Sequence, residues 1–178
     1  MEPKWKVKQS RTTRFRFFDV VEEEVETGSG TEMKYEYVTG RQGVCVMPLL
    51  DGGRRVVCLR QYRHAIRSWQ WEFPAGGLEE GVDALVMARR ELSEETGYTA
   101  ERWTDLGAFY PSFGFTTQSI HLFAAEELTA GEQHLEPGEE LEVHILETEE
   151  LVRLIANGEF RHGAGLAAVA RWWARGRS

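Results

Sequence analysis

The first part of the chain alternates between apolar and polar positions, with many β-branched and aromatic residues, which is the pattern of half-buried strands. The mostly apolar run GVCVMPLL indicates a strand buried on both faces, and the DGG that follows it favours a hairpin turn. In chain order we predict a strand at 13–26, a turn at 28–30, strands at 33–39 and 43–50, a turn at 51–53, a strand at 54–63 and a short strand in 69–77, ended by Pro74 and the glycines.

Helical features appear next, between two residues that suit helix ends. Asp83 is a good N-cap and Gly97 a good C′ residue, so we predict a helix over about 84–96. At the helical period, Leu85, Ala88 and Leu92 share one face, which we expect to contact the core.

The remainder of the chain predicts more strands and then two helices, the order of an α+β layered domain. Trp172 and Trp173 in the last helix are expected to pack, not to bind a ligand. The predicted elements are strands at 103–110, 119–128 and 141–147, a helix capped by Thr148 that runs to about Asn157, and a helix at 164–176.

Composition narrows the class of protein. The 178 residues suit one domain with at most a small extension, and 42 % hydrophobic residues suffice for a core. A net charge of −8 argues against a nucleic-acid binder. Cys45 and Cys58 lie singly in apolar runs, as buried thiols do. With no membrane-spanning stretch and no secretory signal at the N-terminus, we expect a cytoplasmic protein. The basic N-terminal residues leave two readings open, an anion-binding arm or a solvated edge strand.

The predicted helix 84–96 concentrates carboxylates on one flank. Glu91, Glu94 and Glu95 fall within about 100° of one another, where they repel unless a cation lies among them. Hard divalent cations such as Mg²⁺ favour such oxygens. The alternative is a solvated acidic face with Arg90 paired to Glu94. The turn at 74–77 favours the cation, because glycine lets backbone carbonyls come close to a metal.

This stretch resembles the Nudix box, G-x5-E-x7-R-E-U-x-E-E-x-G-U, in which U is bulky and apolar. Val82 replaces the first glutamate of the box, and Tyr98 fits the last position loosely. The resemblance implies an α/β/α sandwich around a mixed sheet and Mg²⁺-dependent hydrolysis of a nucleoside diphosphate linked to another group, with Mn²⁺ as a substitute metal. It makes Glu91, Glu94, Glu95 and the carbonyl of Ala75 the metal ligands. The positions that match the box are Gly76, Arg90, Glu91, Leu92, Glu94, Glu95 and Gly97.

Over most of its length the chain is similar to the ADP-ribose pyrophosphatase branch of that family. The similarity lies in residues 61–77, 108–128 and 137–146. It implies an N-terminal strand extension (1–40) that contributes to a homodimer and to the substrate site, and a hydrolase domain (41–178). Phe113 and Gln118 depart from the pattern of the branch, which leaves the preference for ADP-ribose open.

Candidate roles follow for residues outside the box. Arg63 is a candidate phosphate or ribose contact, because guanidinium suits phosphate oxygens, and Glu72 a candidate contact to the substrate. Glu139 or Glu140 is where the branch has a catalytic glutamate, which would take the proton of the attacking water while Glu95 acts through the metal. Each of these could instead be an ordinary surface or strand residue.

Two questions stay open at this stage. Arg90, without the usual glutamate at position 82, must pair with Asp83, Glu94 or water. The substrate could also be another nucleotide, namely GDP-mannose or another sugar nucleotide, a dinucleoside polyphosphate, a nucleoside triphosphate or a capped RNA end. A non-catalytic nucleotide-binding module is the competing class.

Overall fold

The computed structural model describes residues 4–135 and 138–176. The chain forms two compact units. One contains the residues up to Arg41 together with Tyr110–Ser119, and the other contains Gln42–Phe109 and the residues from Ile120 onward. In the described part of the chain, no helix combines the length and the apolar character needed to cross a membrane.

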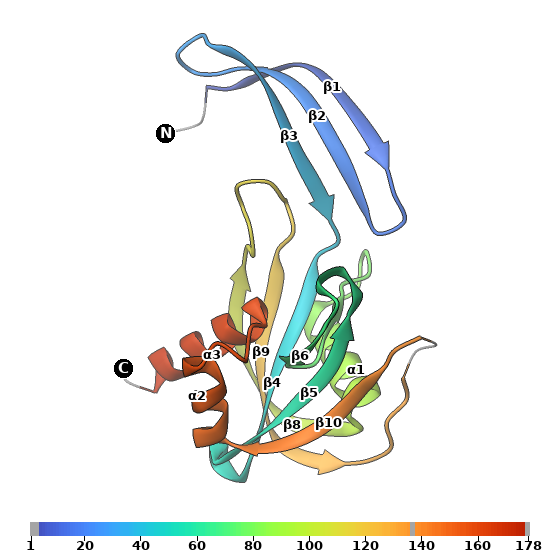
Figure 1. Cartoon of the computed structure of the whole chain (residues 1–178), viewed down its shortest axis with the longest axis vertical. Coiled ribbons are helices and arrows are strands. Elements are labelled where there is room, and N and C mark those ends of the chain that lie inside the picture. Colours follow the sequence, from blue (N-terminus) through green and yellow to red (C-terminus); the bar gives the residue numbers. More distant parts are fainter. Residues whose placement is uncertain (1–3, 136–137, 177–178) are drawn as a thin grey trace. The chain divides into compact units, whose positions relative to one another are not determined.

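The first unit is a three-stranded antiparallel sheet in the order β1-β2-β3 (Figure 1). The prediction of one strand over 13–26 is wrong, because a turn after Arg14 separates two strands and Phe15 N–H donates to Phe18 O at 3.0 Å. Segment 110–119 joins the sheet where Val38 N–H donates to Phe115 O at 2.8 Å. The strands are β1 (Lys6–Arg14), β2 (Phe18–Glu26) and β3 (Glu32–Gly40).

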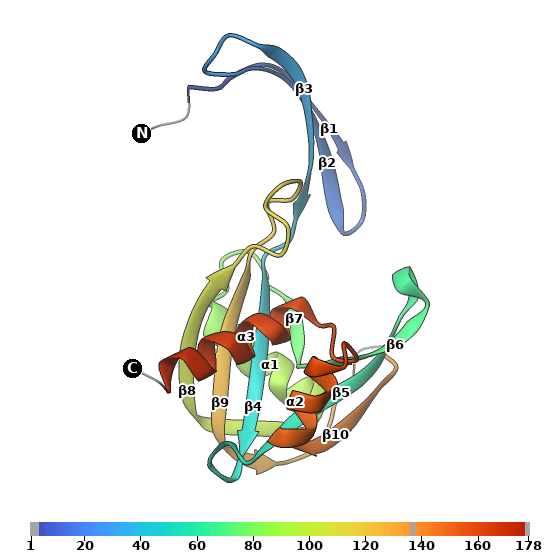
Figure 2. The same ribbon diagram turned by 60° about the vertical axis from the view of Figure 1, so that its left-hand side comes forward.

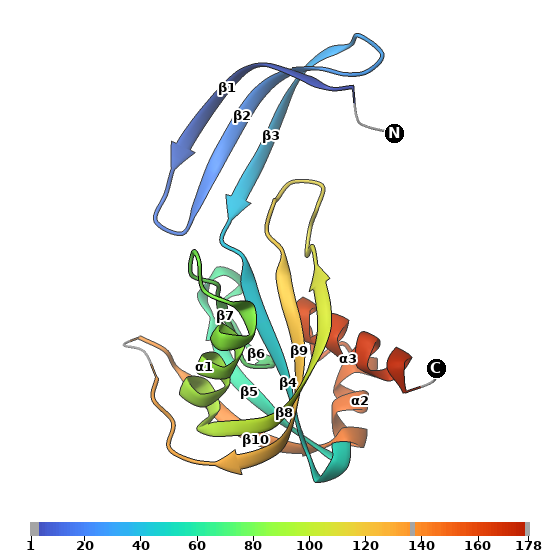
Figure 3. The same ribbon diagram turned by 180° about the vertical axis from the view of Figure 1, so that it is seen from behind.

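The second unit is built on a mixed sheet with the strand order β10-β5-β4-β9-β8 (Figure 3). The pair β4 and β9 is parallel and the other pairs are antiparallel. Two short strands lie off this order, β6 against β5 and β7 against β4. The strands are β4 (Gly43–Leu50), β5 (Arg55–Arg63), β6 (Ser68–Glu72), β7 (Ala75–Gly77), β8 (Tyr98–Phe109), β9 (Ile120–Ala130) and β10 (Leu141–Glu147).

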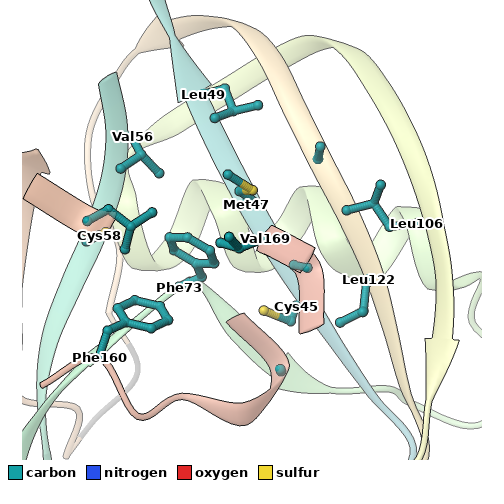
Figure 4. Packing of buried hydrophobic residues seen from close by; sticks show 14 of the residues in the cluster. Cys45, Met47, Leu49, Val56, Cys58, Phe73, Leu106, Leu122, Phe160 and Val169 are labelled. Atoms are coloured by element: carbon teal, nitrogen blue, oxygen red, sulfur yellow. The ribbon is translucent and has the colours of Figure 1, made fainter. Parts of the chain in front are cut away.

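Helices cover both faces of this sheet, α1 (Ala84–Thr96) on one face and α2 (Thr148–Ala156) with α3 (Gly163–Arg175) on the other (Figure 2). Alternation along β4 explains the two layers. Val44 and Val46 pack in the cluster under α1, whereas Cys45 and Met47 pack with Phe160 and the α3 residues (Figure 4). The predicted α/β/α sandwich with a mixed sheet is confirmed, and both cysteines are free and buried as expected.

One local prediction at the start of α2 needs correction. Thr148 is the first helical residue and not the cap, which is Glu147. The Thr148 hydroxyl donates to Gly53 O at 2.7 Å and so ties α2 to the β4–β5 connection. That connection forms a 3-10 turn over Asp51–Gly53 between antiparallel strands, which agrees with the predicted hairpin.

Candidate active site

Helix α1 has the ends and the buried face that the sequence predicts. The Asp83 carboxylate accepts hydrogen bonds from Leu85 N–H at 2.9 Å and Val86 N–H at 3.2 Å. Gly97 ends the helix with a positive φ of 76°, and a Cβ there would also lie 2.8 Å from Gly131 O. Because Leu92 is fully buried, the rotation of the helix is fixed, and with it the direction of the acidic flank.

Glu95 is a buried carboxylate that contacts the β7 backbone. Its Oε2 accepts a hydrogen bond from Ala75 N–H at 2.9 Å, and the residue is 4 % exposed. Burial raises the pKa of Glu95 well above its ordinary range; the Ala75 bond and the Arg63 charge lower it, whereas the charges of Glu91 and Glu139 raise it further. The site therefore holds an acid that would ionise more readily if a cation were close to it.

Glu91 lies against the next residue of the same short strand. A Cβ placed on Gly76 would be 2.1 Å from Glu91 Oε1 and 2.2 Å from its Cδ, so the carboxylate occupies the space that any side chain at position 76 would fill. Ala75 and Gly76 thus bring two of the three predicted helix ligands, Glu95 and Glu91, to one stretch of backbone. This explains why the box has glycine at position 76.

Glu94, the third predicted ligand, lies beside Arg90. The Arg90 Nε is 3.7 Å from a Glu94 oxygen, but Arg90 Nη2 donates to Glu79 Oε1 at 2.6 Å. Glu79 was not among the partners expected for Arg90. Of those expected, Asp83 caps the helix, and Glu94 is a longer contact. Val82 is half-buried and packs in the apolar cluster under α1.

Arg63 and Glu72, both predicted to contact substrate, contact each other. Arg63 Nε donates to Glu72 Oε1 at 2.8 Å and Nη2 to Oε2 at 2.5 Å, a bidentate pair. This hydrogen bonding raises the pKa of Arg63, to which the charges of Glu72, Glu95 and Glu139 also contribute. Glu72 is buried whereas the Arg63 side chain is 45 % exposed. Glu72 is therefore placed to orient the guanidinium.

The two candidate bases occupy different environments. Glu139 is half-buried, and its charge raises the pKa values of both Glu95 and Arg63. Glu140 is exposed and is not among the groups that perturb either residue. Pro137, which belongs to the same predicted loop, lies outside the described residues.

His162 was missed by the sequence reasoning, which assigned it no role. Its Nδ1 accepts a hydrogen bond from Phe73 N–H at 3.1 Å, two residues before Ala75. Burial lowers the pKa of His162, while the Glu72 charge raises it and the Arg63 charge lowers it. The neutral ring therefore supports the backbone that leads into β7. No sequence spacing links position 162 to position 73.

The donor chemistry of this region fits a hard divalent cation. Carboxylate oxygens are the ligands that Mg²⁺ and Mn²⁺ prefer, and a cation would offset the charges of Glu91 and Glu139, which raise the pKa of Glu95. Among residues 4–135 and 138–176, no three His, Cys, Asp or Glu side chains converge closely enough to form a preassembled metal site.

Comparison with known proteins shows the family and the fold of the chain. The NUDIX domain model matches residues 39–169. The chain is 36 % identical over 146 residues to an ADP-ribose pyrophosphatase of Bacillus subtilis (strain 168), an alignment covering 81 % of this chain and 78 % of the relative. It is 38 % identical over 110 residues to a methanol dehydrogenase activator of Bacillus methanolicus, covering 62 % and 59 %. A crystal structure of an ADP compounds hydrolase superposes with a TM-score of 0.86, at 22 % identity, over 100 % of this chain and 97 % of the other.

Proposed function

This chain belongs to the Nudix family, and from that premise we propose that it hydrolyses ADP-ribose to AMP and ribose 5-phosphate with Mg²⁺. As a Nudix pyrophosphohydrolase it acts on a nucleotide diphosphate linkage. The observation that carries the proposal is the placement of Glu95 and Glu91 against Ala75 and Gly76. The substrate is inferred from the Bacillus subtilis relative that bears the name ADP-ribose pyrophosphatase.

In this proposal Glu91, Glu94, Glu95 and the carbonyl oxygen of Ala75 would hold the metal, and Mn²⁺ could replace Mg²⁺. When bound, the cation would neutralise the diphosphate oxygens and acidify the attacking water. It also allows a protein of net charge −8 to accept an anionic substrate.

The residues of the chain supply positioning and proton transfer. Glu139 accepts the proton of the water, in preference to Glu140, because Glu139 is half-buried and its charge acts on Glu95 and Arg63, whereas Glu140 is exposed. Arg63, whose side chain is 45 % exposed, presents its guanidinium to a phosphate oxygen. The buried Glu72 holds that guanidinium in place through two hydrogen bonds.

Sugar nucleotides are a second candidate substrate class, because Phe113 and Gln118 depart from the sequence pattern of the ADP-ribose pyrophosphatase branch. A sugar nucleotide such as GDP-mannose has the same diphosphate linkage and would use the same metal ligands. The two candidates differ only in the groups attached to the diphosphate, so a substrate panel separates them.

The test is a comparison of kcat/KM for ADP-ribose, GDP-mannose, ATP and a dinucleoside polyphosphate with Mg²⁺, with the products identified by chromatography. We expect ADP-ribose to give the highest value and to yield AMP. A higher value for ATP would refute the branch assignment. Absence of hydrolysis for the whole panel, with either Mg²⁺ or Mn²⁺, would favour a nucleotide-binding module instead.

A further inference from the structure

We propose that Glu79 supplies to Arg90 the carboxylate that Val82 cannot provide, and that this pair keeps Arg90 from competing with the metal for Glu94 and Glu91. Glu79 is thus inferred to be a positioning residue for metal binding. The inference concerns this chain's own substitution at position 82. It rests on the proposed function in assigning a metal to α1.

A tight turn before α1 brings Glu79 close to Arg90. Val82 N–H donates to Glu79 O at 3.1 Å, and Gly81 has a φ of +79°. Residues 79–82 therefore form a turn that places position 79 next to position 82. A carboxylate at either position could then reach an arginine in the second turn of α1.

Arg90 lies closer to Glu79 than to Glu94. Arg90 Nη2 donates to Glu79 at 2.6 Å, within hydrogen-bond distance, whereas Glu94 is 3.7 Å away. The Asp83 carboxylate already accepts hydrogen bonds from two backbone N–H groups. Glu79 is therefore the main partner of Arg90.

Loss of the Glu79 carboxylate would remove the hydrogen bond that it accepts from Arg90. An arginine without this partner would be drawn towards Glu94, whose carboxylate already lies 3.7 Å from the Arg90 Nε, and towards the neighbouring Glu91. Since a cation cannot occupy oxygens that a guanidinium has taken, metal affinity should fall. Both members of the pair are partly exposed, so the effect should be about two- to fivefold, the range of an exposed ion pair.

Substitution of Glu79 by glutamine, compared with Glu80→Gln, tests the inference. Glu80 is the neighbouring exposed carboxylate of the same turn, so it reports the loss of one charge alone. Mn²⁺ binding to the substrate-free protein is measured by electron paramagnetic resonance, and the Mg²⁺ concentration for half-maximal hydrolysis is measured separately. Glu79→Gln should weaken Mn²⁺ binding and raise the Mg²⁺ requirement by about two- to fivefold. Glu80→Gln should change neither.

A rescue variant makes the test specific. Adding Val82→Glu to Glu79→Gln should restore metal binding, because position 82 lies in the same turn as position 79 and a carboxylate there can pair with Arg90 once it turns out of the apolar cluster in which Val82 packs. Thermal melting of each variant checks that the fold is retained. Equal metal binding by wild type, Glu79→Gln and Glu80→Gln would overturn the inference, as would a double variant that stays weak. If wild type hydrolyses nothing, the proposed function fails, but the Mn²⁺ measurement still decides the role of Glu79.

Discussion

Ala75 and Glu95 are joined by a hydrogen bond of 2.9 Å, in which the backbone N–H of the first β7 residue donates to a buried carboxylate of α1. Glu95→Gln keeps an oxygen that can accept this bond but removes the charge needed for a metal. We expect hydrolysis to fall by at least about a hundredfold while the protein stays folded. The rate and a thermal melt are measured beside Glu101→Gln, an exposed β8 control. Near wild-type activity of Glu95→Gln would refute its assignment as a ligand.

The same carboxylate should make stability depend on pH. Between its ordinary pKa of 4.5 and its raised folded value, Glu95 binds more protons in the native state than in the unfolded state. The free energy of unfolding contributed by this group therefore falls as pH rises through that window. Wild type should lose stability relative to Glu95→Gln from about pH 5 upward, and Mg²⁺ should reduce the difference. Urea unfolding across pH, with and without Mg²⁺, measures this; parallel curves for the two proteins would contradict it.

Gly76→Ala should displace Glu91 without unfolding the protein. The new Cβ would lie 2.1 Å from Glu91 Oε1, and the end of a flexible side chain can move away. We expect a change in unfolding free energy below about 1 kcal/mol and a loss of activity of about tenfold or more. Gly163→Ala is the matched control, because a Cβ there meets nothing within 4 Å. Full activity of Gly76→Ala would show that the position of Glu91 is unimportant.

Local sequence signals predicted α1 well and long-range contacts poorly. Asp83, Gly97 and the face containing Leu92 are readable because a helix has a fixed period and characteristic end residues. The alternation of apolar and polar residues over 13–26 led to the wrong prediction of a single strand, because the alternation continues across the turn after Arg14. The Glu79–Arg90 pair depends on a positive φ at Gly81, which periodicity does not reveal.

The remaining site contacts join segments far apart in the chain. His162 and Phe73 are 89 positions apart, and their hydrogen bond exists only because α3 packs on the sheet. The choice between Glu139 and Glu140 likewise depends on how the segment before β10 lies beside Arg63. Neither follows from the spacing of residues within one motif.

We also predict a homodimer, from the resemblance to the ADP-ribose pyrophosphatase branch and from the strand-rich N-terminal unit. In the turn between β1 and β2, Phe15 and Phe17 are 54 % and 67 % exposed, and exposed apolar side chains that lie together commonly mark interfaces. Light scattering should give twice the chain mass of 20.4 kDa, about 41 kDa. Phe17→Glu should weaken the dimer, whereas Val86→Glu, at an exposed site on α1, should not. A 20.4 kDa particle for wild type at micromolar concentration would rule the dimer out under those conditions.

The identity of the base is tested by comparing Glu139→Gln with Glu140→Gln. Each variant removes one carboxylate from the same short segment, so the change in net charge is equal. If Glu139 accepts the proton, Glu139→Gln should lower kcat by about 10²- to 10⁴-fold and flatten the acidic limb of the pH–rate profile. KM should change little, because the substrate contacts remain.

Glu140→Gln should keep both kcat and the profile, since Glu140 is exposed and perturbs neither Glu95 nor Arg63. The pH profile matters because a merely structural role for Glu139 would lower the rate equally at all pH values. A reversed result, with Glu140→Gln inactive and Glu139→Gln active, would mean that this segment rearranges when substrate binds. Equal, small losses in both variants would place the base elsewhere, and Glu95 would then be the next carboxylate to test, because it already lies at the Ala75 backbone.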